Sequence, residues 1–219
     1  IYVDHCVAEH NAGQLSSNMG AKAKMMASEV EWKMVDLGVQ LHGGAGFMDE
    51  YPISRMFSEE AARGFYRRWA ELMGLLETLS EPEYERPLGD GWPVKVHLAH
   101  ITAWERSLLG ILGKRSRAAA MGVPEDLWQL GDTDAVNGFL AAQATGETTG
   151  AILERLRDTH AEVVEAIGAL TDKDLERPYS DYQPGDLPYN PDPVGGWVAG
   201  NTWEHYEEHI GWLRAGLGS

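Results

Sequence analysis

The chain has 219 residues, of which 43% are hydrophobic, and its 34 acidic side chains outnumber 18 basic ones, for a formal net charge of -16. An acidic surface repels polyanions, so we expect neither nucleic acid nor an anionic membrane among its partners. No run approaches the roughly 20 apolar residues that cross a bilayer, and no signal-peptide pattern opens the chain. A cytoplasmic location is therefore expected.

Helical spacing of apolar residues predicts three helices in the first half of the chain. The first covers about residues 16–41 and ends at a glycine-rich turn, which permits a change of backbone direction. Pro52 stands where a new helix commonly begins, and apolar residues at helical intervals continue over about 54–79. A third helix is expected from Pro93 to about Gly113, because proline is tolerated in a first helical turn.

The second half continues with helices and long connections. A short helical turn is expected at 124–128, and a helical pattern then covers 134–170. Glycines and threonines over 145–150 lower helix propensity, so two collinear helices or one kinked helix would fit there. A proline- and glycine-rich loop, 179–196, is predicted to cover a pocket as a lid before the last helix, about 202–215. No segment shows a convincing strand pattern, so the predicted fold class is all-α.

Histidines gather in the third and the last predicted helices. His205 and His209 are four residues apart and project from one helix face, so together they can hold one metal ion or one polar substrate. In VHLAHITAWE, His97 lies at the centre of the apolar stripe and His100 lies about 60° to one side of it. Either of these two can enter the bundle and complete a site with the first pair.

The histidines allow three interpretations. Three neutral imidazoles can ligate a divalent transition metal, zinc or nickel, and leave positions open where bound water becomes a nucleophile. A metal-free alternative pairs a histidine with a carboxylate, such as Glu105 or Glu204, as a general base for water. In the third interpretation the imidazoles are simply hydrogen-bonded inside the bundle or stand at its surface.

Large aromatic residues are frequent in the second half of the chain. Trp104, Trp128, Tyr182 and Tyr206 are predicted to contact the substrate near the histidines, where flat rings suit an extended, planar or heteroaromatic ligand. Each of them can instead be an anchor of the core or of a loop. The sequence leaves both roles open.

Residues 1 to about 57 resemble part of the C-terminal helical domain of acyl-CoA dehydrogenases, through HCVAEHNAG and VQLHGGAGFMDEYPISRMF. In that family the glycines of QLHGG approach FAD, so Gln40, Gly43 and Gly44 are the matching positions. The sheet domain that holds the flavin ring has no counterpart here, so no functional FAD is expected. The resemblance implies a packing element, with a possible homodimer through the N-terminal helices; recruited nucleotide binding is the alternative.

Residues from about 58 to 219 resemble the DinB-like superfamily, in particular its ClbS/DfsB-like branch. The segments that carry this are GWPVKVHLAHITAWERSLL, GVPEDLWQLGDTDAVN, RPYSDYQPG and GNTWEHYEEHIGWL, in the family's order. The resemblance implies a DinB-like four-helix bundle with an additional N-terminal helical segment, and hence two domains, 1–57 and 58–219. It also maps the metal histidines of the superfamily onto His100, His205 and His209.

The ClbS/DfsB-like resemblance further implies a detoxification or self-resistance hydrolase. Such a protein would open a strained or electrophilic group of a small molecule, for example a natural-product toxin. His100, His205, His209 and Glu105 would then be the catalytic residues. Two alternatives stay open, namely a metal-dependent, thiol-using transferase or isomerase of the broader DinB type, and a non-catalytic protein that sequesters the molecule.

Overall fold

The computed structural model describes residues 2–16, 52–89, 91–186 and 188–218. Within these ranges the regular elements are helices, and pairing of extended backbone is limited to isolated bridges between prolines. The predicted all-α fold class is confirmed. None of the helices in the described ranges is long and apolar enough to cross a membrane. The predicted helix over 16–41 and the flavin-matching glycines fall almost wholly outside the described residues.

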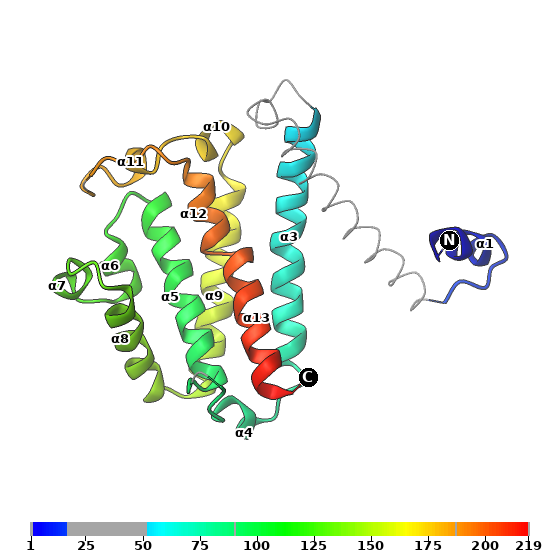
Figure 1. The fold of residues 1–219 in the computed structure, drawn as a ribbon, viewed down its shortest axis with the longest axis horizontal. Coiled ribbons are helices and arrows are strands. Elements are labelled where there is room, and N and C mark those ends of the chain that lie inside the picture. Colours follow the sequence, from blue (N-terminus) through cyan, green and yellow to red (C-terminus); the bar gives the residue numbers. More distant parts are fainter. Residues whose placement is uncertain (1, 17–51, 90, 187, 219) are drawn as a thin grey trace. The chain divides into compact units, whose positions relative to one another are not determined.

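Twelve helices are described in chain order (Figure 1). Their bounds are α1 Tyr2–Asn11, α3 Pro52–Leu76, α4 Glu81–Tyr84, α5 Val94–Leu112, α6 Arg117–Met121, α7 Glu125–Trp128, α8 Thr133–Thr145, α9 Thr149–Gly168, α10 Asp172–Leu175, α11 Tyr179–Tyr182, α12 Val194–Gly200 and α13 Trp203–Leu217. The chain divides into two compact units, Ile1–Phe65 and Tyr66–Ser219. This division lies later in the chain than the predicted boundary after residue 57, and the predicted domain bounds stay a prediction.

The first unit contains α1, which was not predicted from the sequence because its residues form no clear apolar stripe. Cys6, the single cysteine of the chain, is buried, whereas Val7 and His10 on the same helix are exposed. The expected homodimer through the N-terminal helices stays a prediction.

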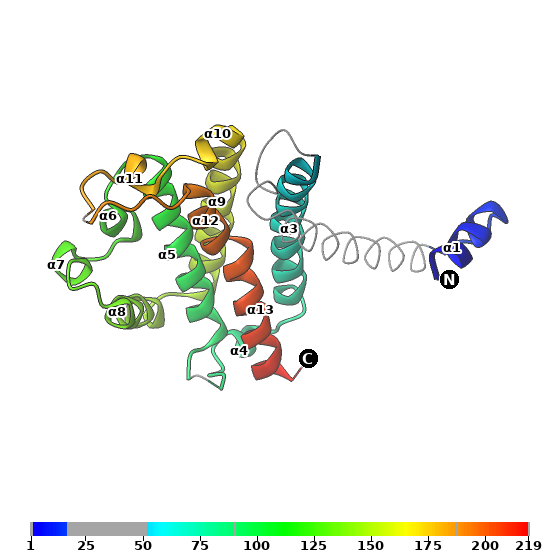
Figure 2. The ribbon, with the colours of Figure 1, turned by 45° about the horizontal axis from the view of Figure 1, so that its top comes forward.

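Four long helices, namely the second part of α3 with α5, α9 and α13, run side by side in the second unit and form a bundle (Figures 1 and 2). Trp69 of α3 stacks on His160 of α9, with ring centroids 3.5 Å apart. The core consists of fully buried aliphatic side chains, each of which stabilises the fold by roughly 1.5–3 kcal/mol. They are Leu72, Leu98, Ile101, Leu108, Ile111, Ile152, Leu156 and Leu213.

The first half of helix α5 is enclosed on all sides, whereas Arg106 further along it is exposed. Helix α5 packs against α9 and α13 within the bundle, and against α6 and α8, which lie outside the bundle on its other side (Figure 2). As a result, every side chain from Val94 to Ala103 is buried. A helix that is enclosed in this way has no solvent face to receive a polar residue. His97 and His100 therefore both enter the protein interior, although the sequence pattern alone left this choice open.

The helical pattern predicted over 134–170 is divided into α8 and α9, and the chain turns between them (Figure 1). Gly146 ends α8, and the Thr148 hydroxyl then accepts a hydrogen bond from the Ala151 amide at 3.3 Å and caps α9. Neither a collinear pair nor one kinked helix describes this turn, so that expectation is wrong. A helix end and a new cap follow each other closely here, and this permits a full change of direction.

The predicted lid over 179–196 begins inside the core. Tyr179 and Tyr182 of α11 are buried in a cluster with Ile111 and Val194. The Tyr182 hydroxyl donates a hydrogen bond to the backbone oxygen of Asp174 at 3.0 Å. Lid movement stays a prediction, and these anchors confine it to the middle of the segment.

Candidate metal centre and pocket

Three imidazoles from α5 and α13 converge in the second unit. The Nε2 atom of His205 lies 3.1 Å from Nε2 of His100 and 3.0 Å from Nε2 of His209. One ligand atom from each of the three lies within 4.8 Å of the others. The helical spacing of His205 and His209 aims both at α5, as the sequence predicted. His100 completes the group, and the structure thus brings together the three residues that were proposed as metal ligands.

Burial keeps these imidazoles neutral. Desolvation, reinforced by the nearby His205 and His97, lowers the pKa of His100 to about 3. Desolvation also lowers the pKa of His205 to about 4. Desolvation, and then the neighbouring imidazoles, lower the pKa of His209 far below its ordinary value. Near neutral pH each ring therefore carries one proton and one lone pair, which is the state that ligates a metal ion.

The contacts between the ring nitrogens fit a shared metal ion better than a set of hydrogen bonds. His205 Nε2 faces two other Nε2 atoms, yet a neutral ring nitrogen either donates one proton or offers one lone pair. Two N···N contacts therefore cannot both be well-formed hydrogen bonds. Tetrahedral ligands at roughly 2.0–2.1 Å from zinc are themselves about 3.3 Å apart, close to the separations seen here. The Nδ1 atoms of His100 and His205 are buried without a hydrogen-bond partner in the described part of the chain.

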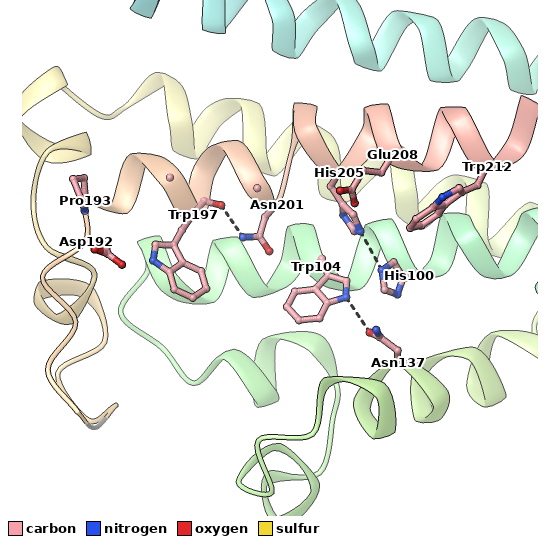
Figure 3. A pocket seen from close by; sticks show the side chains of 12 residues that line it. His100, Trp104, Asn137, Asp192, Pro193, Trp197, Asn201, His205, Glu208 and Trp212 are labelled. Carbon is pink, nitrogen blue, oxygen red and sulfur yellow. Dashed lines mark hydrogen bonds between the residues drawn. The ribbon is translucent and has the colours of Figure 1, made fainter. Parts of the chain in front are cut away.

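A hollow of about 580 Å³ opens beside His100 and His205 (Figure 3). Trp104 forms part of its wall, and the indole Nε1 donates a hydrogen bond to Asn137 Oδ1 of α8 at 3.3 Å. The remaining lining residues come from α12, from α13 and from the segments just before and just after α12. They are Asp192, Pro193, Gly196, Trp197, Gly200, Asn201, Glu208 and Trp212.

A second hollow of about 620 Å³ adjoins the same cluster. It is lined by Trp92 and His209 and shares His100, Asn137 and Trp212 with the first hollow. The histidine cluster therefore borders both hollows, and each hollow is large enough for a small-molecule ligand.

Two of the predicted site residues belong to a different buried cluster. Glu105 is fully buried, and its Oε1 accepts a hydrogen bond from the Tyr206 hydroxyl and lies 3.1 Å from His160 Nδ1. Burial raises the pKa of Glu105, against the opposing effect of its hydrogen bonds to His160 and Tyr206. Neither Glu105 nor Tyr206 lines the two hollows. In this structure they join α5, α9 and α13 through a polar network inside the bundle.

Trp128 and Tyr182 also lie away from both hollows. Trp128 packs over the guanidinium of the buried Arg117, whose Cζ is 4.8 Å from the ring centroid. Arg117 also lies 4.9 Å from the Trp197 ring and donates to Ser107 Oγ at 2.8 Å. Of the four aromatic residues predicted to contact substrate, the structure places Trp104 alone in the wall of the pocket.

Sequence reasoning missed several residues that line the pocket. Glu208 and Trp212 follow His205 and His209 by three residues, so helical spacing already placed them near the histidines. Asn137 carried no such signal, because it reaches the pocket through the packing of α8 on α5.

The comparisons with known proteins agree with this architecture. The model of the DinB superfamily matches residues 65–209, so the chain belongs to that superfamily. Among solved structures, the colibactin self-resistance protein ClbS, crystallised in complex with double-stranded DNA, superimposes with a TM-score of 0.55 at 18% identity. The superposition covers 74% of this chain and 95% of ClbS. At that identity the likeness establishes a shared fold.

The complex of ClbS corrects one expectation. Nucleic acid was excluded as a partner because of the formal net charge of -16, yet a protein of this fold binds double-stranded DNA. Net charge sums over the whole surface, whereas a duplex contacts only one local region of it. The exclusion of nucleic acid from the overall charge was therefore wrong.

The N-terminal region matches a different family, the C-terminal domain of acyl-CoA dehydrogenases, over residues 1–66. The mouse mitochondrial long-chain specific acyl-CoA dehydrogenase is 36% identical over 72 residues, which are 33% of this chain and 17% of that enzyme. The (2S)-methylsuccinyl-CoA dehydrogenase of Cereibacter sphaeroides is 32% identical over 31% of this chain and 12% of its own length. The chain thus spans less than a fifth of these enzymes, and the predicted resemblance is confirmed for this segment.

Proposed function

We propose that this chain is a metal-dependent detoxification or self-resistance protein that adds water to a small electrophilic molecule. The observation that carries the proposal is the convergence of the Nε2 atoms of His100, His205 and His209 at the edge of a hollow of about 580 Å³. The self-resistance role of ClbS, which has the same fold, supports the class of substrate.

In this proposal each of the three histidines holds the ion through Nε2. When bound, a divalent transition metal lowers the pKa of a coordinated water toward neutrality and makes hydroxide available. Glu208 is exposed and lines the same hollow, so its carboxylate can accept the proton that the water loses. The oxygen of the water would then bond to the electrophilic carbon of the substrate while the strained carbon–carbon bond at that carbon breaks and its electron pair passes to the activating carbonyl group. The proton held by Glu208 would return to the carbon released in this way, so that the product gains one water in total.

The remaining lining residues would orient the substrate. Trp104 and Trp197 offer flat apolar surfaces on one side of the hollow, and Trp212 offers another beside the histidines (Figure 3). Between them the amides of Asn137 and Asn201 provide polar contacts. This combination suits a ligand with an extended planar part and a few hydrogen-bonding groups.

Elemental analysis and mass spectrometry test the proposal. Protein purified without a nickel column should carry about one zinc or nickel ion per chain. It should convert a cyclopropane activated by a carbonyl group into a product heavier by one water. The double variant His205→Ala/His209→Ala should lose both the ion and the reaction, whereas His10→Ala, which removes an exposed histidine of α1, should lose neither. Undiminished hydrolysis in the double variant would contradict the proposal.

The same measurements separate the alternatives. A substrate that is recovered unchanged after incubation supports sequestration in the pocket. A product that contains a thiol added to the mixture supports the transferase, and the double variant should then lose that product. Protein without any bound metal that still hydrolyses the cyclopropane supports general-base hydrolysis.

As a second candidate function, we propose that double-stranded DNA is a partner of this chain, as it is of ClbS. Exposed Arg106, Lys114 and Arg115 lie near the end of α5, and the two arginines line one small hollow together with Ser116 and the carboxylate of Glu162. Three basic side chains stand against one carboxylate here, and a local excess of positive charge can contact phosphates. Anisotropy of a labelled duplex at low salt tests this, and no binding there would contradict it.

A further inference from the structure

A fourth imidazole stands directly behind the three that converge. His97 of α5 is fully buried, and its Nδ1 lies 3.0 Å from Nδ1 of His209. The other ring nitrogen of His209, Nε2, lies 3.0 Å from His205 Nε2 and faces the metal centre. His209 thus sits between two imidazoles, with one nitrogen directed to each.

A single proton can lie between the two Nδ1 atoms, and its position decides what His209 can bind. If His209 Nδ1 carries the proton and donates it to His97, then His209 Nε2 keeps its lone pair for a metal ion. If His97 Nδ1 carries the proton, then neutral His209 must be protonated at Nε2 and cannot ligate. The two tautomers therefore differ in whether the centre has two ligands or three.

We propose that His97 is a positioning residue that accepts the Nδ1–H of His209 and thereby holds His209 in the metal-binding tautomer. This inference rests on the proposed function, because it concerns the same centre. It assigns a role to a residue that lines neither of the two hollows. A hydrogen bond from the second nitrogen of a ligand histidine typically changes metal affinity about 10–100-fold.

His97 contacts the ring nitrogen of His209 that faces away from the metal centre. In the described part of the chain, the other two ligands have no such contact. The Nδ1 atoms of His100 and His205 have no hydrogen-bond partner in the described part of the chain. His97 and His100 are also three residues apart on α5, and they contact His209 and His205, which are four residues apart on α13. The two contacts fix the register of α5 against α13 at the centre, and Trp92 packs on His97 with ring centroids 5.6 Å apart.

Two substitutions at residue 97 separate positioning from packing. In His97→Asn the amide oxygen takes the place of Nδ1 and still accepts a hydrogen bond, whereas His97→Leu fills similar space without an acceptor. We expect His97→Leu to weaken zinc binding about 10–100-fold, and His97→Asn to stay within about threefold of the unsubstituted chain. Competition with a chromogenic zinc chelator measures each affinity in the full chain, and His10→Leu serves as the matched control.

Nitrogen-15 NMR of the metal-free protein provides the readout that packing would not change. The unsubstituted chain and His97→Asn should show His209 protonated at Nδ1, and His97→Leu should show this signature lost. Thermal unfolding of each variant identifies any loss of affinity that comes from misfolding. If His97→Leu misfolds, the tautomer and the zinc affinity of His97→Asn decide: a value near that of the unsubstituted chain supports the inference, and a loss overturns it.

The outcomes distinguish this inference from the proposed function. Equal zinc affinity in His97→Leu and the unsubstituted chain would overturn the role of His97 and leave the metal centre intact. An absence of zinc binding in the unsubstituted chain would overturn the metal centre. The NMR result would then test the role of His97 separately. Protonation of His209 at Nε2 in the unsubstituted chain would overturn the positioning role of His97.

Discussion

The imidazoles of His100 and His205 link the stability of the metal-free protein to pH. Burial lowers the pKa of His100 to about 3 and that of His205 to about 4, whereas an unfolded imidazole titrates near about 6.5. Between these values the unfolded chain binds more protons than the folded chain, so stability must fall as the pH falls. From about pH 7 to pH 5 the expected loss is about 1–2 kcal/mol for each of these imidazoles.

Urea unfolding in the presence of a chelator measures this loss over the same pH range. The double variant His100→Leu/His205→Leu removes two of the responsible groups, so its stability should change less with pH than that of the unsubstituted chain. Parallel pH profiles for the two proteins would contradict the assignment to these imidazoles.

Local spacing was sufficient to predict how His205 and His209 lie relative to each other. The separation of His205 from His209 fixes their shared face, and this holds in the structure. Which of His97 and His100 enters the bundle depended on which sides of α5 are covered by other helices. The sequence of one helix does not show which elements pack against it. For the same reason Glu105 and Tyr206, which lie next to the site in sequence, turn toward α9 instead and meet His160.

At the scale of elements, the close contact between α5 and α6 depends on a glycine, Gly110, at the point where the two helices meet. A Cβ atom on Gly110 would lie 3.1 Å from Ala120 Cβ and 3.3 Å from Arg117 Cα. A Cβ atom on Gly138 in α8 would have no neighbouring atom within 4 Å, so Gly138 is a matched control. We expect Gly110→Ala to lower the free energy of unfolding by about 1–3 kcal/mol through overpacking. Gly138→Ala should instead raise it by about 0.4–1 kcal/mol.

Chemical denaturation of the two alanine variants tests this pair. The change in side chain and in helix propensity is the same in both, so a difference in sign isolates the effect of packing. Equal stabilisation by both substitutions would mean that α6 approaches α5 less closely than the structure indicates.

The elements themselves were predicted with uneven success. The third and last predicted helices agree with α5 and α13 to within a few residues, because proline, glycine and the apolar spacing mark their ends. The turn between α8 and α9 was not predicted. Low helix propensity indicates that a helix is interrupted, but it does not give the angle between the two helices that result. The direction of α9 is set by its packing on α5, a contact between residues far apart in sequence.

At the scale of the whole molecule, the charge distribution predicts how DNA binding should depend on salt. The formal net charge of -16 opposes approach of a duplex, so any contact must be made by a local basic region. If Arg106, Lys114 and Arg115 contact phosphates, each charge removed should lower the slope of log affinity against log salt by about 1. Anisotropy titrations of Lys114→Ala and Arg115→Ala measure that slope.

Lys173→Ala, which lies on α10, is a matched control for the loss of one positive charge. Equal slopes for all three variants and the unsubstituted chain would contradict a duplex contact at the end of α5. The overall architecture was predicted from the family resemblance. The prediction about nucleic acid failed, because the net charge does not say where on the surface the positive charges lie.

The layer formed by α6, α7 and α8 has a consequence for how such a protein can diversify. This layer lies outside the four bundle helices, yet through Asn137 it contributes to the walls of both hollows. Changes there would alter which ligand is accepted while the imidazoles and the aliphatic core around α9 and α13 remain untouched. If the chain acts as proposed, part of its selectivity would therefore come from a layer that holds none of the three imidazoles, and that part could change while the imidazoles stay in place.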